Sequence, residues 1–243
     1  LTGAALPDLA VILAEPPAAG GRFVRFLQNS NGLFTETGST QVTPPGTYAL
    51  DHEVADVDGD GDGDLLVHWA AGYLRVFINQ PSGYEPGYLA PFAAGQMSVV
   101  DIGLGGGVDL GSTLYDPEVR LGDGAGSFSD PIYHDVPGIA YAVFVDDVDH
   151  DGVPDLIVGG HGDAVLQNQV SDALGLGGGS FGPFANWHTI GDVRMARPAD
   201  MNADGLTDLV LGLSDSQLVI VENGHGPWEK RGHSLAGAAG YSR

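Results

Sequence analysis

Residues 56–64 alternate aspartate with small residues in a pattern that could bind a calcium ion. Carboxylates stand at positions 1, 3, 5 and 9 of this run, namely Asp56, Asp58, Asp60 and Asp64. Calcium takes about six to eight oxygen ligands, and short carboxylate side chains on alternate residues can converge on one point. Gly61, at position 6, permits the sharp reversal of the backbone that such convergence requires. The run therefore predicts a calcium-binding loop.

The residues after this loop distinguish it from an EF-hand. An EF-hand needs a bidentate glutamate at position 12 and helices on both sides of the loop. Position 12 is Val67, which lies in an apolar segment that is typical of a β-strand. We therefore expect the loop to join two strands of a hairpin.

The same nine-residue pattern recurs twice, at residues 147–155 and 200–208, and leucine follows each copy. The polar residues at positions 1, 3, 5 and 9 are Asp147, Asp149, Asp151 and Asp155 in the second copy, and Asp200, Asn202, Asp204 and Asp208 in the third. A fourth copy, residues 101–109, keeps its two end aspartates but has glycine at positions 3 and 5. A fifth survives only as Pro7–Val11. The three complete copies predict three calcium sites.

The loops belong to a repeat of about 50 residues, a period that is typical of propellers and solenoids. Five units share an Asp-Leu pair, a residue that ends the next strand, and a later aromatic residue. The Asp-Leu pairs begin at Asp8, Asp64, Asp109, Asp155 and Asp208, the strand ends are Asn29, Asn79, Asp123, Asn168 and Asn223, and the aromatic residues are Phe34, Tyr84, Phe128, Phe181 and Trp228. Four short strands per unit and glycine-rich turns predict an all-β fold, a β-propeller of five four-stranded blades forming one domain over residues 1–243.

Two details of the repeat give further expectations. Phe181 lies 13 residues after Asn168, whereas the other units have a spacing of five, so we expect an inserted surface loop within residues 169–179. The repeat pattern also continues across the termini. We therefore expect residues 233–241 to supply the first strand of the blade that begins at Asp8, which would close the ring and remove open sheet edges.

The repeat resembles a known family. The motif Asp-x-Asp-x-Asp-Gly-x-x-Asp-Leu, followed by two strands and Gly-x-Phe, is similar to the FG-GAP or VCBS repeat of bacterial surface proteins, fungal lectins and integrin α-chain propellers. The resemblance implies a calcium-binding β-propeller in which the position-7 carbonyl joins the side chains at positions 1, 3, 5 and 9 as a ligand. The position-7 residues are Asp62, Val153 and Leu206. Integrin propellers have seven units, so the chain could instead be part of a larger seven-bladed array.

Composition argues against several function classes. Nine basic and 32 acidic residues give a net charge of −23, which argues against nucleic acid as a partner because phosphate binding needs a basic face. The sequence contains no run of about 18 apolar residues, so it predicts no membrane span. Neither a His-Glu-x-x-His nor a Gly-x-Ser-x-Gly motif is present, so we assign no catalytic residue. Paired carboxylates of a glycosidase would be hidden among the loop aspartates.

Together these observations predict an extracellular or cell-surface recognition or adhesion module, stabilised by calcium, that binds a glycan or a protein partner. Aromatic residues that could stack on sugars are Trp69, Trp187, Tyr73 and Tyr84. Two alternatives stay open: a polysaccharide hydrolase or lyase with its site at one mouth of the ring, and a structural subunit of a surface assembly. We expect a monomer, because a tethered strand has a high effective concentration for its own gap, whereas donation of that strand to a neighbour would build a filament.

Overall fold

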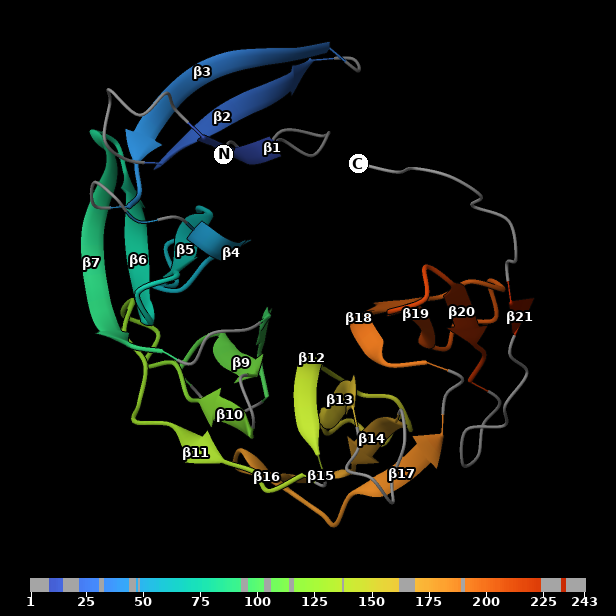
Figure 1. Cartoon of the computed structure of the whole chain (residues 1–243). Coiled ribbons are helices and arrows are strands. Elements are labelled where there is room, and N and C mark those ends of the chain that lie inside the picture. The colour runs from blue at the N-terminus through green and yellow to red at the C-terminus, as the bar shows by residue number, and fades with distance from the viewer. Residues whose placement is uncertain are drawn as a thin grey trace. The chain divides into compact units, whose positions relative to one another are not determined.

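The computed structural model describes residues 9–14, 22–30, 33–43, 47, 49–92, 96–102, 106–113, 116–136, 138–161, 169–188, 191–223 and 233–234. The regular elements of these residues are β-strands arranged in antiparallel sheets (Figure 1). No helix among them is long and apolar enough to cross a membrane. The chain divides into two compact units. The first contains Leu1–Ala94, Gly105–Val108 and Leu121–Ser129, and the second contains Gly95–Leu104, Asp109–Arg120 and Asp130–Arg243.

The first unit contains two sheets that pack on one core. The strands β1 (Leu9–Ala14), β2 (Arg22–Ser30) and β3 (Leu33–Gln41) form the first sheet, and β4 (Ala49–Ala55), β5 (Asp64–Trp69), β6 (Tyr73–Gln80) and β7 (Gly83–Pro91) form the second. Every residue of β5 is buried, which explains why its sequence is a short, almost continuous apolar run. Side chains from both sheets meet in a core of Val24, Phe26, Val42, Leu65, Val67, Trp69 and Phe77.

The second unit contains three four-stranded sheets. Their strands are β8 (Met97–Val100), β9 (Asp109–Thr113), β10 (Pro117–Arg120) and β11 (Ile132–Tyr133); β12 (Ile139–Asp146), β13 (Asp155–His161), β14 (Gln169–Ala173) and β17 (Ala185–His188); and β18 (Val193–Ala199), β19 (Asp208–Leu213), β20 (Leu218–Val221) and β21 (His233–Ser234). A small hairpin of β15 (Gly175–Gly177) and β16 (Ser180–Phe181) lies between β14 and β17 in the sequence. Phe144, Ile157, Leu209 and Leu211 are among the core residues that join the last two of these sheets.

The predicted strand starts are confirmed. In each four-stranded sheet, the second strand begins at the aspartate of an Asp-Leu pair: Asp64, Asp109, Asp155 and Asp208. The preceding strand ends just before the loop, so each loop joins two antiparallel neighbours. The loops at residues 56–64, 101–109, 147–155 and 200–208 therefore connect β4 to β5, β8 to β9, β12 to β13 and β18 to β19, respectively.

The predicted surface loop within residues 169–179 is wrong in its first part, because residues 169–173 form β14 and pair with both β13 and β17. The error comes from the choice of Asn168 as a strand end. The backbone N–H of Gly175 bonds to the last aspartate of its loop, as the N–H groups of Asn79 and Asn223 do in other units. Gly175 lies 20 residues after that aspartate, compared with 15 for the other two. The extra residues of this unit therefore precede Gly175.

The predicted role of the C-terminal strand is wrong for His233 and Ser234. They pair with Ile220 and Val219 of β20, and thereby form the fourth strand of the sheet that contains β18, β19 and β20. Pairing with the nearest strand in the sequence closes a shorter loop than pairing with the strands that begin at Asp8, and shorter loops lose less entropy on closure. The remaining residues of the predicted closure, 1–8 and 235–243, lie outside the described residues. Ring closure, the count of five blades and the single domain stay predictions.

Candidate metal centre

In the first loop, local hydrogen bonds turn the carboxylates towards the backbone of the loop. The two carboxylate oxygens of Asp56 accept hydrogen bonds from the N–H groups of Gly59 and Gly61, at 2.8 and 3.0 Å. Asp58 accepts one from the N–H of Asp60 at 3.3 Å. One oxygen from each of Asp56, Asp58 and Asp64 lies within 4.8 Å of the others. The sequence has thus folded three acidic side chains around one point.

The second and third loops share two of these hydrogen bonds, from the N–H at position 6 to position 1 and from the N–H at position 5 to position 3. The other bond to position 1 comes from the N–H at position 4 in the first loop and at position 5 in the second and third. The N–H groups at positions 5 and 6 donate to the position-1 aspartate, which is Asp147 in the second loop and Asp200 in the third. The side chain at position 3 accepts a bond from the N–H at position 5 in both loops. In the second loop, oxygens of Asp147, Asp149 and Asp151 lie within 4.8 Å of one another. The third loop has the same backbone pattern but uses a neutral amide, Asn202, at position 3.

These distances and donors fit calcium. Two oxygens that bind one calcium ion at about 2.3–2.6 Å can lie at most roughly 5 Å apart, and both clusters meet that limit. The side-chain donors are carboxylate and amide oxygens, which calcium prefers. The position-7 residues donate their N–H groups to the position-5 carboxylate, in the pairs Asp62 to Asp60, Val153 to Asp151 and Leu206 to Asp204. Their role as carbonyl ligands, and the full ligand sets, stay predictions.

The aspartate at position 9 has a structural role that the sequence analysis missed. Asp64, Asp155 and Asp208 are at most 1% exposed. One oxygen of each accepts the N–H at position 2 of the loop, from Val57, Val148 and Met201. The other oxygen accepts an N–H at or just beyond the end of the third strand, from Asn79, Gly175 and Asn223. The position-9 aspartate therefore joins the loop to the end of the third strand of its sheet, which is not one of the two strands that the loop connects.

The degenerate fourth loop keeps this structural contact. Asp109 is 2% exposed and accepts a hydrogen bond from the N–H of Ile102 at 2.9 Å. The survival of Asp109 in a loop that has lost its ligands was the signal in the sequence that indicated a second role. Burial raises the pKa of Asp64 and of Asp155, while the hydrogen bonds that their carboxylates accept from backbone N–H groups lower the pKa in part.

Two positions of each loop have left-handed backbone. At position 4, φ is 77° for Gly59, 60° for His150 and 61° for Ala203, and at position 6 it is 92° for Gly61, 88° for Gly152 and 86° for Gly205. The predicted need for glycine at position 6 is thus confirmed by the geometry, whereas position 4 also accepts a residue with a side chain. The larger φ at position 6 is farther from the left-handed region, near +57°, that L-residues can adopt.

Replacing Gly205 by alanine should lower the free energy of unfolding by about 1–2 kcal/mol, measured by urea denaturation in a chelator. An added Cβ at Gly205 would meet no atom within 4 Å, so the expected loss is conformational and not steric. Ala203→Gly in the same loop is the matched control. It relieves a left-handed alanine, and we expect it to leave stability unchanged or slightly higher. Equal stability of Gly205→Ala and the unchanged protein would contradict the assigned backbone role.

Two of the loops are tied to neighbouring segments through the carbonyl at position 2. The side-chain amide of Asn223 donates to the carbonyl of Val148 at 2.6 Å, and Asn223 is 5% exposed. Its backbone N–H donates to Asp208, so one residue contacts both the second and the third loop. In the first unit, the N–H of Gly126 donates to the carbonyl of Val57 at 3.0 Å. The loop conformations therefore depend on tertiary contacts as well as on local ones.

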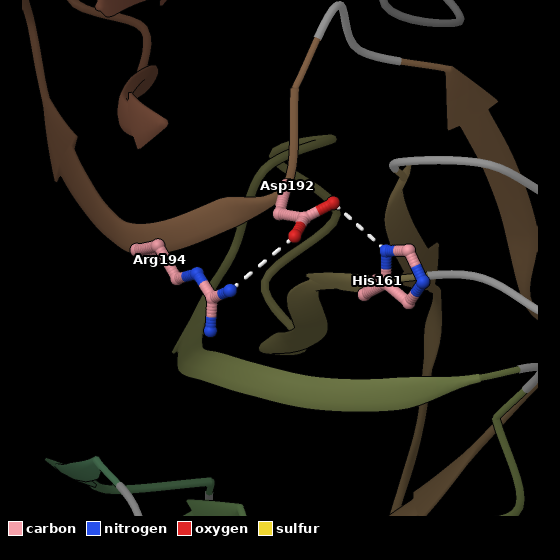
Figure 2. Close-up of polar contacts among 3 residues, drawn as sticks. All are labelled: His161, Asp192 and Arg194. Carbon is pink, nitrogen blue, oxygen red and sulfur yellow. Dashed lines mark hydrogen bonds and ion pairs between the residues drawn. The ribbon is translucent and has the colours of Figure 1, made fainter. Parts of the chain in front are cut away.

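A second polar cluster lies elsewhere in the second unit (Figure 2). Asp192 contacts His161 at 2.8 Å and Arg194 at 3.3 Å, and the guanidinium of Arg194 lies 4.1 Å from the centre of the Tyr141 ring. An aspartate beside a histidine is part of many hydrolytic sites. Ser171 lines a cavity of about 10 Å³ together with His161, but it is only 2% exposed and so is inaccessible as a nucleophile. The cluster is best described as a link between β13 and the start of β18.

Residues 2–67 match the sequence profile of the FG-GAP-like repeat. The N-terminal part of the chain is therefore similar to an FG-GAP-like repeat. The matched residues of this FG-GAP-like repeat include the entire first loop, from Asp56 to Asp64. The second and third loops lie outside them but share with the first loop the hydrogen bonds from position 6 to position 1 and from position 5 to position 3.

Solved structures with a similar fold are β-propellers. BBS1N, solved in complex with ARL6DN and soaked with lead, has a TM-score of 0.56 and 13% identity over 88% of this chain and 60% of that one. Raptor from Chaetomium thermophilum has a TM-score of 0.57 and 13% identity over 92% of this chain and 19% of that one. The chain therefore spans less than two thirds of either protein chain. No curated protein matches the sequence. The similarity shows the fold, and the predicted resemblance to a repeat-built β-propeller is confirmed.

Proposed function

We propose that this chain is a calcium-stabilised, non-enzymatic β-propeller module that recognises a glycan or a protein partner outside the cell or at its surface. The single observation that carries the proposal is the set of three loops in which the N–H at position 6 donates to the position-1 aspartate, two of which gather three carboxylates within 4.8 Å. Calcium, when bound, would supply positive charge that offsets these carboxylates and would hold each loop in one conformation.

The charge of the chain supports this role for calcium. Five, four and three acidic residues lie in the first, second and third loops, which makes twelve of the 32 in the chain. Without a cation, neighbouring carboxylates repel one another over distances that salt screens only partly. Calcium sites of extracellular modules have dissociation constants of about 0.1–1 mM, and loops of that affinity would be filled by calcium outside the cell.

A recognition role is supported by the fold and by the lack of an assembled catalytic group among the described residues. BBS1N, which has a similar fold, was solved in complex with another protein. Propellers carry their specificity in surface loops grafted on a common scaffold, so the fold is compatible with a glycan or a protein as ligand. Ser171, which lines a cavity together with His161, is buried and so is inaccessible as a nucleophile. The pair of His161 and Asp192 therefore gives the hydrolase alternative no support.

Calorimetric titration with calcium tests the proposal through stoichiometry. We expect three calcium ions per chain, and two after Asp149→Ala, because this change removes the central carboxylate of the second cluster. Asp116→Ala, an exposed aspartate outside the loops, is the matched control and should still bind three. No uptake of calcium, or unchanged stoichiometry in Asp149→Ala, would contradict the proposal. Uptake of a fourth ion would show that the glycine-substituted loop at residues 101–109 also binds.

A further inference from the structure

The first unit contains a trough lined by the end of β3 and the strands β6 and β7. Figure 1 labels these three strands. Two open cavities, of about 260 and 350 Å³, make up the trough. Thr40 and Tyr84 line both cavities, so the two cavities adjoin at this pair of residues. Each cavity is near the lower limit of ligand sites in size, and together they could hold a small chain of sugar rings.

The lining of this trough has the chemistry of a site for a hydroxyl-rich ligand. Threonine and serine hydroxyls and the amides of Gln41 and Asn79 can each donate and accept hydrogen bonds. Among the lining residues, Arg75 alone carries a charge. The absence of carboxylates from the lining is notable in a chain with a net charge of −23. The trough therefore suits a neutral ligand with many hydroxyl groups better than a cation.

Trp69 supplies an independent observation that points to a ligand. It lines the smaller cavity and is only 8% exposed, and its indole N–H makes no hydrogen bond with the described part of the chain. Buried polar groups in native proteins nearly always have a partner, so an unpaired donor beside a cavity indicates that something else supplies the acceptor. Arg75 lines the same cavity, lies 6.0 Å from the centre of the Trp69 ring and donates one hydrogen bond to the carbonyl of Gly87 at 3.3 Å.

Tyr84 provides a rigid aromatic surface in the middle of the trough. Its ring stacks on Phe26 with centroids 4.3 Å apart and an interplanar angle of 7°. Its hydroxyl donates to the carbonyl of Gly63 at 3.0 Å. Because the stacking and the hydrogen bond already hold the ring in place, it can bind the apolar face of a sugar with little loss of side-chain entropy.

We propose that this trough is a saccharide-binding site for a neutral oligosaccharide, with Tyr84 as the platform and the Trp69 N–H, Thr40 and Gln41 as hydrogen-bonding groups. The inference rests on the recognition role proposed above and assigns its ligand class and position. A peptide would more readily extend the sheet at β3, which is an edge strand, and would then use backbone groups and not the side chains of the trough.

Binding to an array of cello-, xylo-, manno- and chito-oligosaccharides, followed by titration of the strongest ligand, tests the proposal. Trp69→Phe keeps the aromatic packing but removes the N–H, and should weaken binding about tenfold or more. Thr40→Val removes a hydroxyl from both cavities and should weaken it at least about threefold. Thr35→Val is the matched control, because Thr35 is an exposed residue of the same strand outside the trough. The affinity of this variant for the saccharide should change by less than about twofold.

The possible outcomes separate this inference from the calcium proposal. Array binding that both Trp69→Phe and Thr40→Val weaken supports the saccharide site. A protein that takes up three calcium ions but binds no saccharide on the array overturns the inference and leaves the calcium module standing. Binding that neither variant changes also overturns it, as does capture of a displayed peptide, with no saccharide bound, that depends on Thr40. Absence of calcium uptake contradicts the calcium proposal and leaves the array result as it is.

Discussion

Removal of calcium should lower the free energy of unfolding by about 1.8 kcal/mol for each occupied loop, or about 5 kcal/mol for three. This value follows if each loop has a dissociation constant near 0.1 mM and about 2 mM calcium is present, because a ligand that binds only the folded state stabilises it by RT ln(1 + [L]/Kd). A loss of this size is a third or more of the stability of a typical domain. Urea denaturation with 2 mM calcium and with a chelator measures the difference.

Magnesium at the same concentration is the control for this effect. Magnesium demands short, near-octahedral coordination and releases its water reluctantly, so it should stabilise the protein much less than calcium does. Asn202→Asp should increase the calcium response, since it gives the third loop the carboxylate that the other two have at position 3. Identical denaturation midpoints in calcium and in chelator would show that the loops are held by their own hydrogen bonds alone.

Replacement of Asp109 by alanine should lower the free energy of unfolding by about 2–3 kcal/mol, with or without calcium. The change leaves the N–H of Ile102 buried without its acceptor, and an unsatisfied buried donor costs about 1–3 kcal/mol, with more for a bond to a charged group. Calcium should not alter the result, because the loop of Asp109 has glycine at positions 3 and 5. The experiment therefore separates the structural role of the position-9 aspartate from ligand binding.

Asp208→Ala and Asp116→Ala complete this comparison. Asp208 accepts two backbone N–H groups and also belongs to a complete loop, so its loss should cost about 3–5 kcal/mol and should reduce the response to calcium. Asp116 is exposed and should change stability by less than about 0.5 kcal/mol. An Asp109→Ala variant as stable as Asp116→Ala would show that the buried aspartate is not needed in a loop without ligands.

The sequence by itself determined the loops, the starts of the strands that follow them and the fold class. These features are local. The bonds within a loop join residues two to seven positions apart, as from Asp60 to Asp58 and from Val57 to Asp64. The spacing of aspartate and glycine therefore encodes the loop almost completely, and the apolar run after it encodes a buried strand.

Only the tertiary structure decided features that depend on distant partners. The position-9 aspartates bond to N–H groups 15 or 20 residues away, and the contact from Asn223 to Val148 spans 75 residues. The same is true of the register of β14 and of the pairing of β21 with β20, both of which the repeat pattern misassigned. A repeated motif shows which residues are equivalent only where no residues are inserted, and hydrogen bonding selects the register that satisfies the buried backbone groups. The trough beside Tyr84 likewise exists because two sheets pack together, which no single repeat specifies.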